Sequence, residues 1–122
     1  MSKKEFDLQM FIIRGLRRLS YRWPGRSKAM ANARISRGIY QCAICEGEFG
    51  RKDVVVDHER PVVSIKYGFQ NWDTYISRLF CDVDNLQVLC KECHKCKSYL
   101  ERQLRKEYKK EREKKVDNKP KT

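Results

Sequence analysis

Two short cysteine motifs constrain the fold of this chain more than any other feature of its sequence. Cys42 and Cys45 form one Cys-x2-Cys pair, and Cys90 and Cys93 form a second pair 44 residues further along. A two-residue gap lets both sulfurs of one turn face the same ion, and Zn²⁺ prefers four such ligands arranged as a tetrahedron. The spacing between the pairs exceeds the roughly 15–20 residues of a simple zinc ribbon. We therefore expect a structural zinc site with a substantial segment inserted between its two halves.

The two other cysteines leave alternatives open. Cys96 lies three positions after Cys93 and offers a second register for the pair, and Cys81 stands alone. A set of unrelated buried cysteines is the third possibility. A zinc ion would also explain how a chain of 122 residues, 36% of them charged, becomes stable.

The expected compartment also favours a metal over disulfides. We expect no signal peptide, because Glu5 and Asp7 follow the first lysines and Arg14 interrupts the apolar stretch. No apolar run approaches the roughly 18 residues that a membrane span needs. We therefore expect a cytoplasmic protein, in the host cytoplasm if the chain is encoded by a phage, whose thiols are kept reduced.

Charge is distributed unevenly along the chain. Residues 1–41 carry a net charge of +8, residues 42–96 carry −2 and residues 97–122 carry +6, which sum to +12. A nearly neutral centre that holds every cysteine and histidine thus lies between two basic arms. This layout favours a polyanionic partner, with nucleic acid first and an anionic membrane surface second. The membrane is the weaker alternative, because a small core needs the apolar residues of the N-terminal segment.

Apolar spacing and turn residues predict an α+β chain. We expect helices over 5–21, 28–37 and 71–80 and a long helix from Lys91 onward. Strands are expected over 39–44, 54–58 and 86–89, turns over 46–51 and 82–85, and a basic tail from Val116 to Thr122. These elements suggest a basic helical arm over 1–38, a core over 39–100 and a basic helical extension over 101–122.

Both histidines of the chain lie close to this zinc frame in sequence. His58 follows Asp57 at the end of the strand expected over 54–58, and His94 directly follows Cys93. If the four cysteines meet at one ion, Asp57, His58 and His94 come within reach of one another. One carboxylate and two imidazoles suit a catalytic divalent ion with a free imidazole beside it as a base.

These residues resemble the HNH endonucleases, in the zinc-knuckle form that is common in phage genomes. The similarity covers about residues 40–100, and its most specific part is the stretch from Asp84 to Lys97, which contains Asn85 and Cys90-x2-Cys93-His94-x2-Lys97. Two departures are Glu59, where the family usually has an apolar residue, and the segment 62–68, where a glycine-rich stretch is common.

The resemblance implies a ββα-metal (HNH) core, in which two antiparallel strands and a helix surround one catalytic ion. On this reading His58 is the general base and Asn85 orients it. Asp57 and His94 bind the ion, which is Mg²⁺, Mn²⁺, Ni²⁺ or Co²⁺, and the four cysteines hold the structural zinc. The implied activity is hydrolysis of DNA phosphodiester bonds to 5′-phosphate and 3′-hydroxyl ends.

Basic side chains supply the expected contacts to double-stranded DNA. Lys97 follows His94 by one helical turn, and we expect five arginines to contact phosphates, namely Arg14, Arg17, Arg18, Arg34 and Arg37. Lys97 equally fits a solvated surface, whereas the near absence of acidic residues around the arginines makes a solvated face the weaker reading for them. Two further functions stay open: a zinc-stabilised DNA-binding module without nuclease activity, and an accessory protein of a complex such as a DNA-packaging motor. The oligomeric state, which would separate nicking from double-strand cleavage, is not determined by the sequence.

Overall fold

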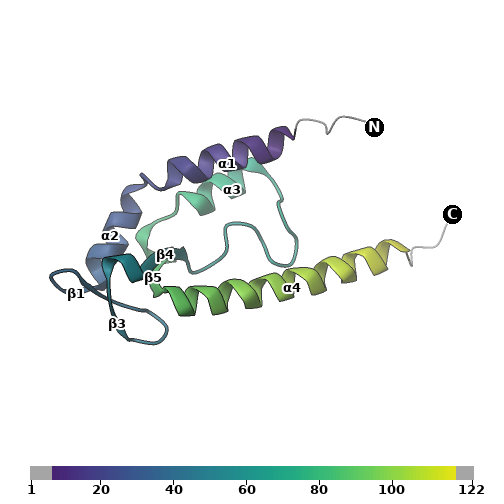
Figure 1. Cartoon of the computed structure of the whole chain (residues 1–122). Helices are drawn as coiled ribbons and strands as arrows, with labels where there is room; N and C mark the ends of the chain where they lie inside the picture. Colours follow the sequence, from purple (N-terminus) through teal and green to yellow (C-terminus); the bar gives the residue numbers. More distant parts are fainter. Residues whose placement is uncertain (1–6, 118–122) are drawn as a thin grey trace, which may run out of the picture.

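The computed structural model of the chain describes residues 7–117, with side chains up to residue 114 (Figure 1). Its longer elements, in chain order, are α1 (Leu8–Ser20), α2 (Pro24–Ala33), β1 (Arg34–Ser36), β2 (Ile39–Gln41), β3 (Glu48–Gly50), β4 (Val54–His58), α3 (Trp72–Leu79), β5 (Leu86–Cys90) and α4 (Lys91–Asp117). Short 3-10 turns, η1 (Arg51–Asp53) and η2 (Val83–Asn85), precede β4 and β5. The expected α+β class is confirmed.

The N-terminal helices differ in their bounds from the prediction. The carboxylate of Asp7 caps α1 by accepting a hydrogen bond from the Met10 N–H at 3.1 Å, and residues 5 and 6 of the predicted helix lie outside the described part of the chain. The second helix begins at Pro24, four residues earlier than expected, because proline is preorganised for the first helical position. Its predicted end at residue 37 is wrong, since Arg34–Ser36 pairs with β2 instead.

Two small antiparallel sheets follow. The first has the order β1-β2-β3, in which Tyr40 of β2 pairs with Phe49 of β3. The turn predicted over 46–51 is therefore partly strand, and the strand predicted over 39–44 ends at Gln41. The tight segment between β2 and β3 carries the first cysteine pair.

In the part of the chain that the structure describes, the second sheet consists of β4 and β5. Val54 pairs with Cys90 at one end and His58 pairs with Leu86 at the other, and β5 runs directly into α4. Strands are present where they were predicted over 54–58 and 86–89, and the long helix begins at Lys91 as expected. The 27 residues between the two strands, including α3 and η2, are an insertion that returns the chain to the partner strand.

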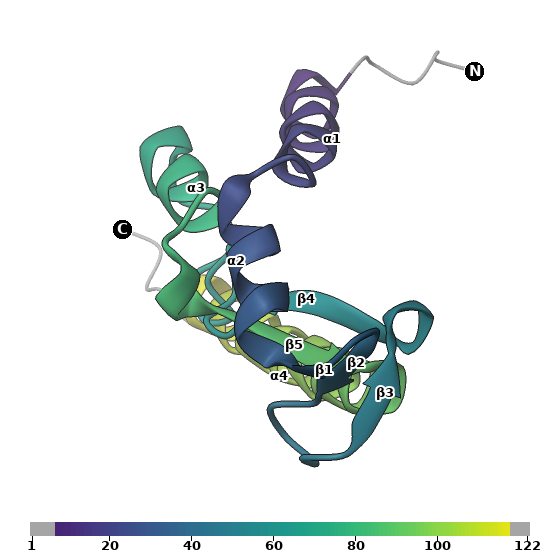
Figure 2. The same cartoon turned by 90° about the vertical axis from the view of Figure 1, so that its left-hand side faces the viewer.

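β5 lies at the centre of the small core. Its Val88 packs with Met30 of α2 and Val54 of β4, while its fully buried Leu89 packs with Cys42 and Cys90. Figure 2 shows α2 lying across this strand. Because β5 ends at Cys90 and Cys93 lies in the first turn of α4, the core and the predicted metal site are one continuous structure.

Hydrogen bonds join the long helix α4 to the segment inserted between β4 and β5. Arg105 donates to the carbonyl of Val63 at 2.8 Å and to that of Ser64 at 3.1 Å, and Arg112 donates to that of Lys66. Beyond these contacts α4 continues to Asp117, so the first residues of the predicted tail are helical, and residues 118–122 lie outside the described part. Among residues 7–117, no helix is both long and apolar enough to cross a membrane.

Candidate metal centre and active site

Four cysteines from distant parts of the chain meet at one point. The sulfurs of Cys42, Cys45, Cys90 and Cys93 all lie within 4.8 Å of one another, and those of Cys45 and Cys90 are 3.9 Å apart. A tetrahedral zinc ion with Zn–S bonds of 2.3 Å separates its sulfurs by about 3.8 Å. This cysteine cluster can therefore hold a structural metal such as zinc. Neither Cys81 nor Cys96 belongs to it.

The first cysteine motif is shaped by a tight turn. The N–H of Glu46 donates to the carbonyl of Cys42 at 3.0 Å, and Glu46 adopts a φ of 61° that side-chain-bearing residues rarely take. A Cβ atom at Gly47 would approach the ring of Phe49 to 2.9 Å, so this position favours glycine. The turn is joined to β5 by a hydrogen bond from the Ala43 N–H to the Val88 carbonyl at 2.8 Å.

Without a cation, the thiols of the cluster differ widely in pKa, so they do not lose their protons together. Burial raises the pKa of Cys42, but backbone N–H groups from both cysteine motifs bond its sulfur and lower the pKa to about 6. The Cys90 sulfur, followed by burial and the other sulfurs, raises the pKa of Cys93 to about 12. A divalent ion removes this conflict because it stabilises all four thiolates together. The residues thus fit the zinc ion that the sequence predicts.

A second polar site lies on the α4 face of β4. The Asp57 carboxylate approaches the His94 imidazole, with Oδ1 at 3.7 Å from Nε2. Its other oxygen, Oδ2, is bonded by the Lys97 ammonium at 2.9 Å and by the Gln87 amide at 3.2 Å. The His94 side chain is 40% exposed and that of Asp57 is 15% exposed. One carboxylate oxygen is therefore fixed by the protein, and the other faces a solvent-accessible imidazole.

Lys97 is part of this site's framework in the structure. Its ammonium also donates to Glu101 at 2.6 Å and to the His58 carbonyl at 3.1 Å. Burial lowers the pKa of Lys97, but the bonds to Glu101 and Asp57 outweigh it and raise the pKa, so the side chain stays charged. In this structure Lys97 is therefore bonded to protein groups, rather than free in solvent or extended toward a phosphate.

His58 follows Asp57 in β4 and therefore lies on the opposite face of the strand. Of the three side chains expected within reach of one another, the structure brings Asp57 and His94 together, while the His58 ring contacts α3 instead. Its Nε2 is 3.0 Å from the Leu79 carbonyl at the end of α3. A carbonyl only accepts, so Nε2 carries the proton and Nδ1 of the neutral ring carries the lone pair. Burial lowers the pKa of His58 and outweighs the Leu79 carbonyl, which raises it, so the ring is neutral at pH 7.

Asn85 holds the loop that follows His58. Its side-chain oxygen accepts from the Arg60 N–H at 3.0 Å, its amide donates to the Arg60 carbonyl at 3.4 Å, and its own carbonyl accepts from the Glu59 N–H at 2.8 Å. Within the described residues, no hydrogen bond joins Asn85 to the imidazole of His58. The side chain of Glu59 is exposed beside this loop.

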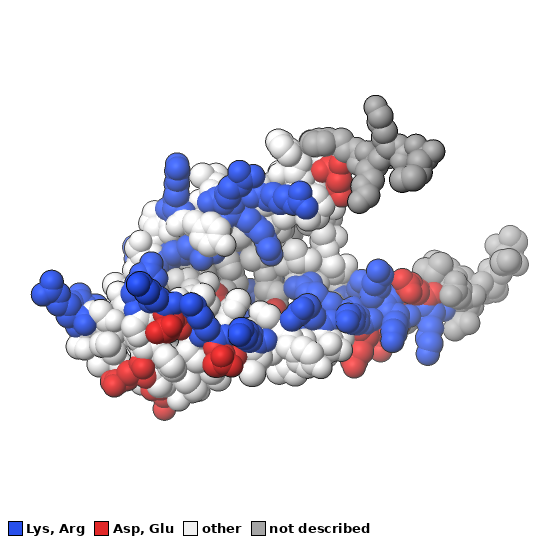
Figure 3. All heavy atoms as spheres, in the orientation of Figure 1, with Lys and Arg blue, Asp and Glu red and all other residues white. Residues whose placement is uncertain are grey.

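The predicted DNA-contacting arginines are exposed, and one of them borders the same cleft as His94. Arg14, Arg17 and Arg18 lie on α1, and Arg37 lies in the turn between β1 and β2, while Arg34 of β1 shares a cleft with His94. Figure 3 shows basic side chains gathered over α1 and along α4, where some acidic side chains lie beside them. The charge separation read from the sequence is therefore also present on this face of the molecule.

Sequence reasoning missed two groups at the site. Gln87 is the one polar residue in the run Leu86–Leu89 and pairs directly with Asp57 across the sheet, so a polar position in an apolar strand was the available signal. The contact between the Leu79 carbonyl and His58 has no such signal in the sequence, because it depends on how the insertion between β4 and β5 folds. Comparisons with protein-family models, curated proteins and solved structures give no match to this chain.

Proposed function

We propose that this protein is an HNH-type endonuclease that hydrolyses DNA phosphodiester bonds. The observation that carries the proposal is the Asp57–His94 pair, brought to 3.7 Å by a strand-strand-helix unit whose end is fixed by the cysteine cluster. In this reading the β4-β5-α4 unit is a ββα-metal core, and His58 stands next to the pair in sequence. Pure DNA binding has no need for this set of residues.

The Asp57–His94 pair suits a catalytic divalent ion. Asp57 Oδ1 and His94 Nε2 offer one oxygen and one nitrogen donor, a set that Mg²⁺, Mn²⁺ and Ni²⁺ accept. Lys97 and Gln87 hold the other carboxylate oxygen, which fixes the orientation of the first. An ion bound there would stabilise negative charge on the phosphate oxygens and on the departing 3′ oxygen.

His58 supplies the base. Its Nδ1 takes a proton from the attacking water while Nε2 stays bonded to the Leu79 carbonyl, which then stabilises the imidazolium that forms. The water oxygen bonds to phosphorus, the bond from phosphorus to the 3′ oxygen breaks, and the 3′ oxygen takes a proton from solvent. The products are a 5′-phosphate and a 3′-hydroxyl. Asn85 acts as a positioning residue, because it fixes the backbone immediately after His58.

Double-stranded DNA is the proposed substrate because of the charge of the chain. A net charge of +12, concentrated in two arms, supports binding to the phosphate backbone without a dedicated base-reading element. We propose low sequence specificity for the same reason. We propose the cytoplasm as the place of this activity, in the host cell if a phage encodes the chain, and a DNA-packaging complex as one context for it.

The test compares two aspartate substitutions that are chemically identical. Zinc-loaded wild type should convert supercoiled plasmid to open-circular or linear DNA in Mg²⁺, Mn²⁺ or Ni²⁺. Asp57→Asn should reduce the rate about 10–100-fold, the range that loss of support at a metal site costs. Asp53→Asn, at an exposed residue of η1, should not change the rate. Equal rates for the two variants would contradict the proposed role of Asp57. If the folded wild type binds DNA but cuts it with none of these metals, the nuclease proposal is wrong and a DNA-binding module is the function that remains.

A further inference from the structure

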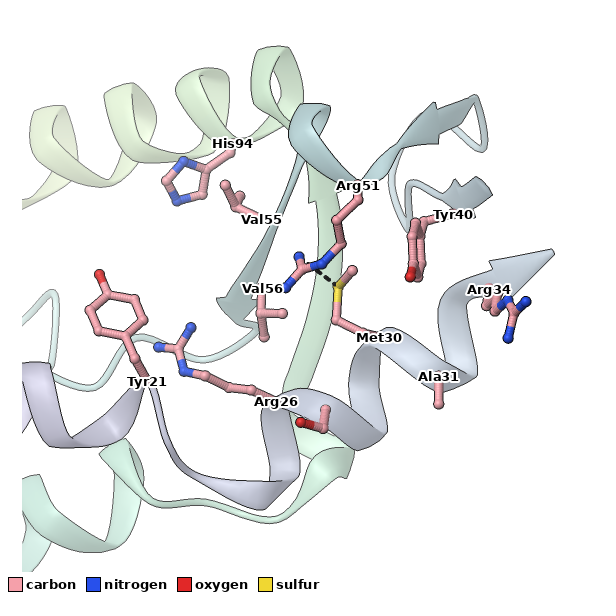
Figure 4. A pocket seen from close by; sticks show the side chains of 11 residues that line it. Tyr21, Arg26, Met30, Ala31, Arg34, Tyr40, Arg51, Val55, Val56 and His94 are labelled. Carbon is pink, nitrogen blue, oxygen red and sulfur yellow. Dashed lines mark hydrogen bonds between the residues drawn. The ribbon is translucent and has the colours of Figure 1, made fainter. Parts of the chain in front are cut away.

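A cleft of about 650 Å³ opens beside His94 (Figure 4). Its floor is the outer edge of β4, which within residues 7–117 pairs with β5 alone, so Val55 and Val56 from both faces of the strand border it. The remaining walls come from α2, the first sheet and η1. His94 and Tyr21 lie at one end, and Arg34 and Tyr40 lie at the other.

The lining of this cleft has one sign of charge. Arg26 from α2, Arg34 from β1 and Arg51 from η1 all border it, and among the residues that the structure describes no aspartate or glutamate does. In Figure 4 the guanidinium groups of Arg26 and Arg51 point into the space below His94. We call this feature the arginine cleft. Three cations from separate elements without a lining carboxylate create a positive field that attracts an anion.

The two inward arginines are held in place by uncharged groups. Arg26 donates its Nε proton to the Ser20 carbonyl at 3.0 Å and stacks on the Tyr21 ring at 4.8 Å, while Arg51 Nη1 lies 3.8 Å from the Met30 sulfur. These contacts orient the guanidinium groups without neutralising them. An arginine fixed in this way is preorganised for bidentate contact with a phosphate.

We propose that the arginine cleft binds the sugar-phosphate backbone of the DNA strand that is cut, beside the scissile bond. The proposal rests on the function proposed above, since the cleft leads directly to His94. Its volume lies in the range of about 300–1,000 Å³ that is usual for sites enclosing a small ligand, which suits a short stretch of backbone rather than a whole duplex. Arg26 and Arg51, which the sequence reading did not select, are then phosphate-binding residues, and Arg34 extends the track away from the reacting bond.

The experiment measures binding without any added catalytic metal. Zinc-loaded protein is titrated into a fluorescent 20-base-pair duplex over a range of salt concentrations. The double variant Arg34→Gln/Arg51→Gln is compared with Lys28→Gln/Lys52→Gln, which removes the same net charge from exposed positions on α2 and η1 that do not line the cleft. We expect the cleft variant to bind at least about tenfold more weakly than the control, as loss of charge-assisted hydrogen bonds implies. Its log–log salt slope should fall by about 1.8, or 0.9 for each lost phosphate contact.

The possible results distinguish failure of the arginine-cleft proposal from failure of the proposed nuclease function. Equal affinity and equal slope for the two double variants overturn the arginine cleft, even if the wild type cuts plasmid. A wild type that does not bind the duplex also overturns it. Cleft-dependent binding without cleavage supports the cleft and contradicts the nuclease. If the Arg51 substitution unfolds the chain through its contact with Met30, Arg34→Gln alone, measured against Lys28→Gln, must still show about half of the slope change.

Discussion

Removal of the metal from the cysteine cluster should destabilise the whole molecule. Cys42 is fully buried and Cys90 is 4% exposed, and both belong to the cluster of buried side chains around Leu89. A metal present at a thousandfold excess over its Kd stabilises the folded state by about 4.1 kcal/mol. That is a large share of the roughly 5–15 kcal/mol that stabilises a typical protein. At about 4 °C for each kcal/mol in a domain of this size, the melting temperature should fall by about 16 °C.

A pair of cysteine substitutions tests this expectation. Cys42→Ser removes one of the four ligands, whereas Cys96→Ser changes an exposed cysteine outside the cluster. We expect Cys96→Ser to retain one zinc per chain and the wild-type melting temperature. Cys42→Ser should lose zinc and melt about 16 °C lower, or fail to fold. Zinc is measured with a metallochromic dye after denaturation, and melting is followed by circular dichroism.

Loss of zinc from Cys96→Ser would refute the assignment of the four ligands. The metal would then be bound in the alternative register, in which Cys93 and Cys96 form the second pair beside Cys42 and Cys45. If both variants kept the wild-type stability after chelation, the packing around Leu89 would suffice without a metal. The second result would also mean that packing alone, without a metal, places His94 beside Asp57.

Three further substitutions test other parts of the structure. Asn85→Ala should lower plasmid cleavage at least about tenfold but stability by only about 1 kcal/mol, because the lost bonds position a loop; a cleavage rate unchanged at reduced stability would contradict the positioning role. Leu89→Ala should lower the free energy of unfolding by about 2–5 kcal/mol in urea denaturation, while Leu100→Ala, at a 60% exposed residue, should change it by about 0.5 kcal/mol or less. Lys97→Met should cost about 1–3 kcal/mol, since two carboxylates lose their partner; unchanged stability would mean that water replaces the ammonium.

The sequence predicted those parts of the fold that local chemistry determines. The β-branched run Val54–Val56 formed β4, and the apolar run before Cys90 formed β5. The spacing of the cysteines identified the four that meet, and not Cys81 or Cys96. In each of these cases the signal and the structure it specifies lie within a few residues of one another, or are linked by the demands of a single ion.

Features that depend on distant pairing were not predictable in the same way. Arg34–Ser36 continues an apparently helical run but joins a sheet, because β2 offers hydrogen bonds that local propensity does not register. The partners of Lys97 include the His58 carbonyl, 39 residues away in the chain. The arginine cleft combines three elements whose proximity follows only from the way α2 crosses β5.

Cleavage of supercoiled plasmid by the zinc-loaded wild type and by His58→Ala, in Mg²⁺ or Mn²⁺, tests the central claim most directly. We predict that the wild type produces open-circular or linear DNA with 5′-phosphate ends. The variant, with its zinc content and DNA affinity unchanged, should be at least about a hundredfold slower because it lacks the base. Equal cleavage by both proteins would contradict the assignment of His58, and the absence of cleavage by a folded, DNA-binding wild type would contradict the nuclease.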